Sequence, residues 1–121
     1  MTSMTLPWPP SVNTYWRHPL TGRFAGMHLI SEKGRAYLKN IQQLCMVARI
    51  KPKEGRLKVT ILASPPDRRA RDLDNVLKGL LDALTHGGAW HDDEQIDDLH
   101  IIRRPVKSGG EIQIEIGEIS Q

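Results

Sequence analysis

Paired cysteines, aromatic residues and long apolar runs are scarce in this 121-residue chain. Cys45 is the only cysteine, so no disulfide can form within the chain, and we expect an inert core thiol in a reducing compartment. No run of 18 apolar residues is present to cross a membrane, and the start of the chain lacks the apolar segment of a secretory signal. We therefore expect a cytoplasmic protein with no membrane partner.

Several kinds of site are also missing. The chain has no Gly-Lys-Ser/Thr loop for phosphate, and its cysteine and histidines do not have the spacing of a zinc site. We therefore expect no small-molecule cofactor. Hydrophobic residues make up 39% of the chain and charged residues 26%, which is typical of a folded protein. This length predicts one domain, covering residues 1–121.

Charge changes sign abruptly near the middle of the chain. Through Arg71 there are 13 Lys and Arg residues against 3 Asp and Glu, and from Asp72 onward there are 4 against 11. The net charge is therefore about +10 in the first part and about −7 in the second. This segregation predicts a surface that grips a polyanion beside an acidic centre.

Two helices are expected from the spacing of apolar residues. Ser31 is a good N-cap for a helix from Glu32 to about Ile50, which Pro52 ends. A second helix is expected from about Asp74 to Thr85, closed by the glycines that follow. The apolar stripes of these helices would face a common core.

Alternating or short apolar segments predict the strands. Residues 7–13 are expected to form a loop because they are rich in proline, and a turn at 107–110 is expected to join the last two strands. The strands are expected at 4–6, 15–18, 27–30, 57–63, 97–106 and 112–116, the second and third pairing with each other. The order β-β-β-α-β-α-β-β predicts an α+β domain with two main helices packed on a mixed β-sheet.

Carboxylates flank the second helix on both sides. Asp72 and Asp74 lie at its start, where either could serve as an N-cap, and Asp92 and Asp93 follow its end. Charges about 4 Å apart repel by roughly 4 kcal/mol at an effective dielectric near 20. If these side chains converge, Mg²⁺ or Mn²⁺ is the natural counter-charge, since both prefer hard oxygen ligands.

Two cations accompany these acids. Lys78 follows Asp74 by four residues on the same helix face, so it could form an ion pair with Asp74 or contact a phosphate beside the metal. Arg71 adjoins Asp72 and could clamp a second phosphate with its planar guanidinium.

At these residues the chain resembles the RusA-type Holliday junction resolvases. The similarity runs almost from end to end, and the central block with the later Asp-Asp pair is its most specific part. The matching segments are Leu6-Pro7-Trp8-Pro9-Pro10-Ser11-x-Asn13, Pro66-Asp67-Arg68-Arg69-x-Arg71-Asp72-Leu73-Asp74-Asn75, Lys78, Asp82-Ala83-Leu84-Thr85, Trp90-x-Asp92-Asp93, Pro105-Val106 and Gly109-Gly110. Ala70 departs from the family, where that position is basic.

This resemblance implies a homodimer that cuts branched DNA. The implied reaction is Mg²⁺-dependent hydrolysis of paired, symmetric phosphodiesters at a four-way junction, leaving 5′-phosphate and 3′-hydroxyl ends in recombination and repair. The implied catalytic residues are Asp72, Asp74, Asp93 and Lys78, with Asp92 as a further metal ligand. The implied basic run is Arg68, Arg69 and Arg71.

Other residues in the first part of the chain are candidates for holding DNA. Tyr15 and Trp16 could stack on unpaired bases at the branch point, although core packing would explain them equally well. Asn13 could contact DNA or order the proline-rich loop. The further candidates for phosphate contact are Arg17, Lys33 and Lys39.

Two alternatives stay open. The chain could be a prophage protein that binds DNA structures without cleaving them, although an intact set of carboxylates speaks against this. It could also be a metal-dependent hydrolase of small phosphate esters, which would explain the acids but not the segregated basic surface.

Overall fold

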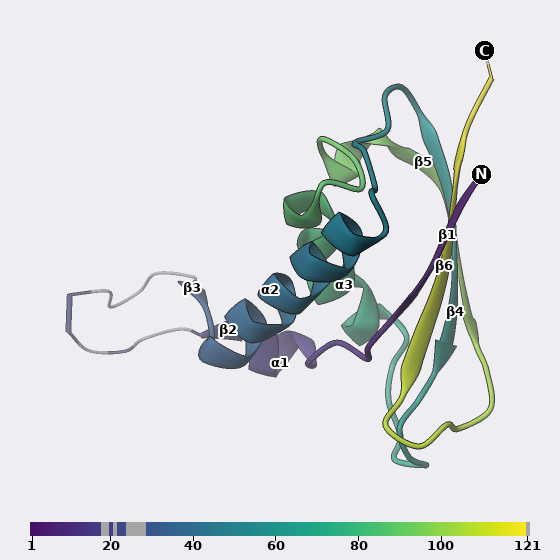
Figure 1. Ribbon diagram of the computed structural model, residues 1–121. Helices are drawn as coiled ribbons and strands as arrows, with labels where there is room; N and C mark the ends of the chain where they lie inside the picture. The colour runs from purple at the N-terminus through teal and green to yellow at the C-terminus, as the bar shows by residue number, and fades with distance from the viewer. Residues whose placement is uncertain (18–19, 21, 24–28, 121) are drawn as a thin grey trace.

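The computed structural model describes residues 1–17, 20, 22–23 and 29–120, without the side chains of Val12 and Asn13. Four strands form the main sheet in the order β1-β6-β4-β5, and two short strands form a separate pair (Figure 1). The main strands are β1 (Thr2–Leu6), β4 (Leu57–Ser64), β5 (Ile96–Arg103) and β6 (Glu111–Glu118). The expected α+β class and element order are confirmed.

The last two strands are joined by the expected turn but do not form a hairpin. β5 and β6 do not pair with each other, because β4 lies between them. β4 pairs with β5 in parallel and with β6 antiparallel. The glycine-containing turn at 107–110 is present, with Gly110 donating from its main-chain N–H to the oxygen of Lys107. The loop that contains this turn crosses the end of β4 and places β5 and β6 on opposite sides of it. Because one of these strands is parallel to β4 and the other antiparallel, the sheet is mixed.

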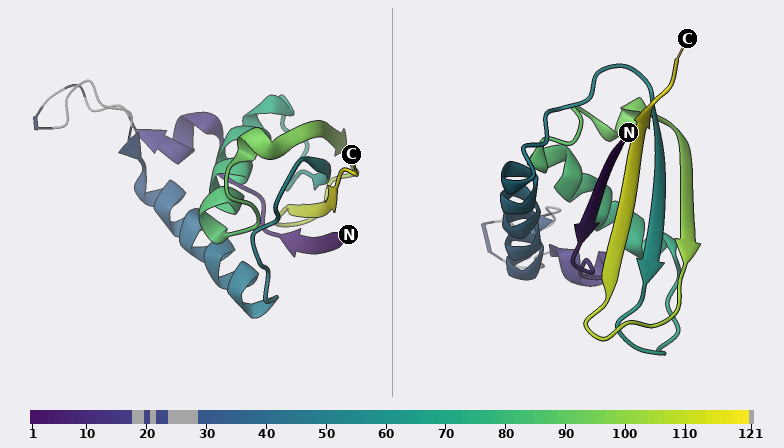
Figure 2. Two further views of the ribbon diagram at one scale, coloured as in Figure 1. Left: turned by 90° about the horizontal axis from the view of Figure 1, so that it is seen from above. Right: turned by 45° about the vertical axis from the view of Figure 1, so that its right-hand side comes forward.

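Two helices cover one face of this sheet. They are α2 (Glu32–Val47) and α3 (Asp74–Gly87), which pack against each other and on the sheet (Figures 1 and 2). The expected alternation in β4 is confirmed, with Leu57, Val59, Ile61 and Ala63 all fully buried. Burial of these apolar faces is the main stabilising contribution to such a fold.

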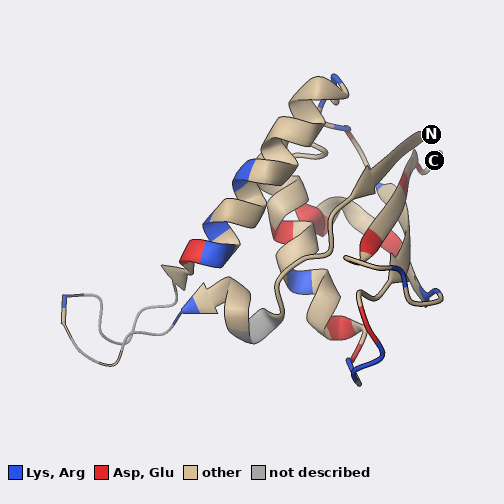
Figure 3. Cartoon of the chain, turned by 60° about the horizontal axis from the view of Figure 1, so that its bottom comes forward, with Lys and Arg blue, Asp and Glu red and all other residues tan. Residues whose placement is uncertain are grey.

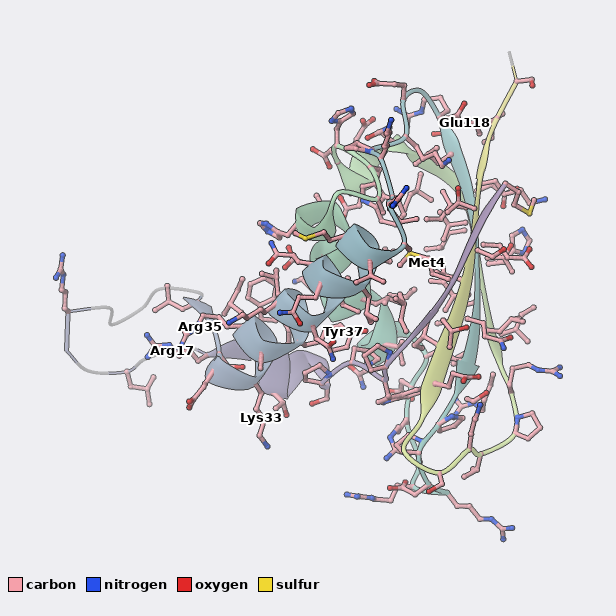
Figure 4. All side chains as sticks on the ribbon, in the orientation of Figure 1. Met4, Arg17, Lys33, Arg35, Tyr37 and Glu118 are labelled. Atoms are coloured by element: carbon pink, nitrogen blue, oxygen red, sulfur yellow. The ribbon has the colours of Figure 1, made fainter. Side chains whose placement is uncertain are left out.

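Helix α2 begins as expected and ends earlier. The Ser31 hydroxyl accepts a hydrogen bond from the main-chain N–H of Gly34, which confirms Ser31 as the N-cap. The helix ends at Val47 rather than near Ile50, because Arg49 adopts a left-handed conformation with φ of 56°. Figure 4 shows Tyr37 directed from α2 toward the sheet and Lys33 directed away from it. Cys45 is buried, as expected.

The proline-rich segment was wrongly expected to be loop throughout. It closes with a short helix, α1 (Val12–Tyr15), which leads into β2 (Trp16–Arg17). β2 pairs with β3 (Leu29–Ile30), which confirms part of the expected pair. The expected strand began one residue too early, because Tyr15 belongs to α1. Residues 18 and 27–28 of that pair lie outside the described residues.

Gly34 allows α1 to dock on α2. A Cβ atom at this position would overlap the main-chain oxygen of Tyr15 and would approach Ile30 Cγ2 to 2.8 Å. The Tyr15 oxygen cannot retreat freely, because it accepts a hydrogen bond from Ser31 at 2.8 Å.

We therefore predict that Gly34→Ala destabilises the fold although alanine is the better helix former. The free energy of unfolding in urea should fall by about 1–3 kcal/mol. Gly117→Ala is the matched control, because its Cβ would meet only Met1 Cε, at 3.8 Å. Equal stability of the two variants would contradict the docking role of Gly34.

Candidate active site

A short loop ahead of α3 positions the first two acids. Asp67 organises this loop, because its carboxylate lies 2.7 Å from the Arg71 guanidinium and accepts a hydrogen bond from the Arg69 main-chain N–H at 3.0 Å. The contact with Arg71 is the larger cause and the hydrogen bond from Arg69 the next. Together they hold the pKa of Asp67 well below its usual range. Arg103 donates to the Arg71 main-chain oxygen at 2.7 Å and ties the loop to β5. Asp72 and Asp74, the leading acids, follow directly.

The leading acids are exposed and do not cap the helix. Leu73 occupies the N-cap position, and no side chain caps α3 in the described part of the chain. The interpretation of either carboxylate as an N-cap is therefore wrong. Their oxygens face solvent and are available to a cation or a ligand.

A cleft of about 390 Å³ opens beside Asp72. Trp8 forms part of the wall of this cleft, and the Arg71 guanidinium lies 6.0 Å from the centre of its ring. The cleft is lined by Trp8, Pro9, Ser11, Pro66, Arg69, Ala70, Arg71, Asp72, Asn75 and Val76.

A second acidic group lies at the far end of α3. Asp92 caps the 3-10 helix η1 (Asp93–Gln95), accepting a hydrogen bond from the Glu94 main-chain N–H at 2.9 Å. Burial, followed by contact with Asp92 and the charge of Asp82, raises the pKa of Asp93. We call Asp82, Asp92 and Asp93 the trailing acids, because both other carboxylates contribute to the raised pKa of Asp93.

Sequence reasoning assigned no role to Asp82. The Tyr15 hydroxyl donates to its Oδ2 atom at 2.8 Å, and His86 lies 3.7 Å from Oδ1. Spacing could have indicated it, because Asp74, Lys78, Asp82 and His86 recur every four residues. These four residues form a polar stripe along α3.

Tyr15 itself does not have the expected role in stacking on bases. Its ring is fully buried and would meet a Cβ atom on Gly79 at 2.9 Å. The core-packing alternative is correct for this residue. Burial, together with the hydrogen bond to Asp82 and the charge of that carboxylate, raises the pKa of the Tyr15 hydroxyl above its usual range. Tyr15 is therefore a neutral donor that orients Asp82.

The structure also separates the alternatives for the two cations. No ion pair joins Lys78 to Asp74 among the described residues. Lys78 Nζ instead lies 6.0 Å from the centre of the Trp16 ring, and the residue is exposed. Arg71 is only 23% exposed and is held by Asp67, so it positions the loop and can offer only part of its guanidinium to a ligand.

The other basic candidates lie on accessible elements. Figure 3 shows basic segments along α2 and in the loop before α3, and acidic segments at both ends of α3. The Asn13 side chain lies outside the description, and Trp16 is half-buried. The exposed candidates are Arg17, Lys33, Lys39, Arg68 and Arg69.

The leading and trailing acids do not meet within one chain. Asp74 and Asp82 are separated by about 12 Å along the axis at 1.5 Å per residue, and Asp93 lies beyond Asp82 in η1. Within the described residues, no group of three or more His, Cys, Asp or Glu side chains is arranged to hold a metal ion. The expected pocket that unites Asp72, Asp74 and Asp93 is therefore not formed by a single chain.

Among the described residues, none of the helices has the length and apolar character needed to cross a membrane.

Asp93 provides a test of the electrostatics. Its folded pKa lies above the ordinary value of about 3.9, so protonation stabilises the fold. That contribution is complete below the ordinary value and is lost as the pH rises through the raised folded value. We predict that Asp93→Asn raises the urea midpoint at pH 7 and that the gain disappears near about pH 3.

Asp97→Asn should have the opposite effect and lower the urea midpoint at pH 7. Hydrogen bonds from Arg56 lower the pKa of Asp97, so its stabilising effect is present at pH 7 and is lost as the pH falls through the lowered value. A lower midpoint at pH 7 for Asp93→Asn would contradict a raised pKa of Asp93.

Comparison with known proteins identifies relatives along nearly the whole chain. The family described as "Endodeoxyribonuclease RusA" matches residues 7–117. The chain is 45% identical over 115 residues to "Crossover junction endodeoxyribonuclease rusA" of Enterobacteria phage HK97, covering 94% of this chain and 92% of the relative. It is 41% identical over 118 residues to the protein of that name from Shigella sonnei, covering 97% and 94%.

Proposed function

Because the chain belongs to the RusA family of endodeoxyribonucleases, we propose that it resolves four-way DNA junctions as a Mg²⁺-dependent homodimer. The family match over residues 7–117 carries this proposal. The exposed leading acids, the polar stripe of α3 and the basic segments on α2 and in the preceding loop support it. Such an activity belongs to recombination and repair in the cytoplasm of a bacterium or of a phage-infected cell.

A second chain would supply the acids that complete each metal site. If two α3 helices run antiparallel beside each other across a two-fold axis, the leading acids of each chain approach the trailing acids of the other. Leu77 and Leu81, beside the polar stripe, are only partly buried, so this face of α3 has apolar surface to cover. We therefore place each metal site between two chains, with Asp72 and Asp74 from one and Asp93, with Asp92 beside it, from the other.

Each residue then has a distinct task. The carboxylates would hold Mg²⁺ or Mn²⁺ through oxygen ligands, and a bound ion would supply Lewis-acid activation of the phosphodiester. Lys78, exposed on the same stripe, would neutralise charge that develops on the phosphate. Tyr15 keeps Asp82 oriented beside Asp93. Two such sites would cut opposed strands and leave 5′-phosphate and 3′-hydroxyl ends.

One observation favours a second candidate function. A single chain forms no three-acid group in its described part, as expected of a DNA-structure-binding protein that does not cleave. Nicking of a synthetic four-way junction with and without Mg²⁺ separates the two candidates.

We predict that Asp74→Asn retains junction binding and loses cleavage by about 100-fold or more, because one ligand oxygen of the reaction centre is lost. Binding is measured by gel shift in EDTA and cleavage by nicking with Mg²⁺. Asp98→Asn is the control, since Asp98 lies on β5 and contacts His100 at 2.8 Å. Cleavage at the parental rate by Asp74→Asn would rule out its metal role.

Lys78→Ala is expected to lower turnover more than affinity, since its charge acts on the reacting phosphate. Single-turnover rates and dissociation constants measured on one junction distinguish the two effects. Lys39→Ala on the exposed face of α2 should show the reverse pattern. A change confined to the dissociation constant in Lys78→Ala would leave this lysine as a phosphate anchor only.

Junction affinity should fall steeply with salt, because bound cations release counterions from DNA. The slope of log affinity against log salt should become shallower by up to about 2 in the Lys33→Gln/Lys39→Gln variant. A flat response in the parent protein would contradict the basic surface as the DNA grip.

A further inference from the structure

We propose that the cleft beside Asp72 binds one unstacked nucleobase of the nucleotide next to the scissile phosphate, with Trp8 as its stacking platform and Asn75 reading its edge. This inference rests on the proposed function and adds to it a base-binding site. All of the residues that line this cleft belong to a single chain.

Trp8 is held rigidly enough to act as a platform. A Cβ atom on Gly110 would lie 2.7 Å from Trp8 Cβ and 3.2 Å from Pro66 Cδ, so Gly110 packs closely against both residues. Gly110 has φ of 74°, a conformation that favours glycine. Trp8 is half-buried against the core. These contacts restrict the movement of its side chain.

A cation reinforces this platform. The Arg71 guanidinium lies 6.0 Å from the centre of the Trp8 ring and is fixed by Asp67. An aromatic face beside an arginine is the combination that binds single nucleic-acid bases by stacking and cation–π attraction. The arginine also brings positive charge to the backbone of the bound nucleotide.

Asn75 supplies the polar group at the rim. It lies in the first turn of α3 and lines the same cleft as Asp72. The residue is exposed, and its side-chain amide makes no hydrogen bond to the described residues. An amide offers both a donor and an acceptor to a base edge, which is how asparagine discriminates among bases.

The size of the cleft selects a single base over a duplex. Its volume of about 390 Å³ lies in the range of small-ligand pockets. Ala70 keeps the wall low, since its side chain is one methyl group. A base inside a duplex cannot enter without unstacking, and unstacking costs least where pairing is already broken. The cleft would therefore favour a branch point and impose a nucleotide preference on the cut.

The first test measures binding without cleavage. Junctions with an abasic site at each position flanking the cut are compared with intact junctions in EDTA. Removal of the base in the cleft should weaken binding by wild-type protein about fivefold or more. Ala70→Leu, which fills the cleft, should bind intact and abasic junctions equally. Equal binding of both junctions by the wild-type protein would overturn the inference while leaving the proposed function intact.

The second test measures preference. Junctions carrying each of the four bases at the flanking positions are nicked with Mg²⁺. Wild-type protein should prefer one base by about tenfold or more, and Asn75→Ala should reduce that ratio below about threefold. The ratio cancels any general loss of activity. Gln113→Ala, on the exposed outer face of β6, should keep the parental ratio.

The outcomes separate the two proposals. An unchanged ratio in Asn75→Ala would overturn the reading of the base by Asn75. Failure of the wild-type protein to bind a junction more tightly than a duplex would overturn the proposed function, and the base site with it.

Discussion

The stiffness of α3 is the constraint on which the rest of the site depends. A helix keeps its ends a fixed distance apart, and here each end has its own acids. The leading acids follow a loop held by Asp67, whereas Asp92 and Asp93 begin η1 and Asp82 lies on α3. Because the helix cannot fold back on itself, the leading and trailing acids of one chain stay apart. In the proposed dimer, the leading acids of each chain would approach the trailing acids of the other.

The buried scaffold holds each half-site in place. Tyr15 connects α1 to the trailing acids through its hydrogen bond to Asp82, and Gly34 lets α1 dock on α2. At the other end, Arg71 and Asp67 fix the loop that leads into α3. Burial, followed by contact with Asp92 and the charge of Asp82, raises the pKa of Asp93. In the proposed two-chain site, a divalent ion would offset the repulsion among the carboxylates brought together.

Patterns that depend on local spacing were predictable from the sequence. The alternation in β4 and the serine cap of α2 reflect local backbone preferences, and both were confirmed. The pairing of β4 between β5 and β6 was not predictable, because a glycine turn resembles a hairpin whether or not a third strand intervenes. The burial of Tyr15 depends on contacts with Gly34 and Gly79, which are distant in sequence.

The candidate site residues were likewise predictable only in part. Residue type and spacing drew attention to the acids and Lys78, and the family resemblance implied their roles. Whether they meet depends on the length of α3 and on what packs beside it, and no spacing rule gives that. Asp82 lacked a sequence signal apart from its periodicity with Lys78, since its significance comes from Tyr15 across the fold.

Mixed dimers test the two-chain site most directly. One chain carries Asp72→Asn with Asp74→Asn, the other carries Asp93→Asn, and the heterodimer is purified through a different affinity tag on each chain. Both homodimers should be inactive with Mg²⁺. In the heterodimer one site loses Asp72, Asp74 and Asp93 together and the other keeps all of its carboxylates, so we predict single nicks in the four-way junction. An inactive heterodimer that still binds the junction would contradict a site shared between chains.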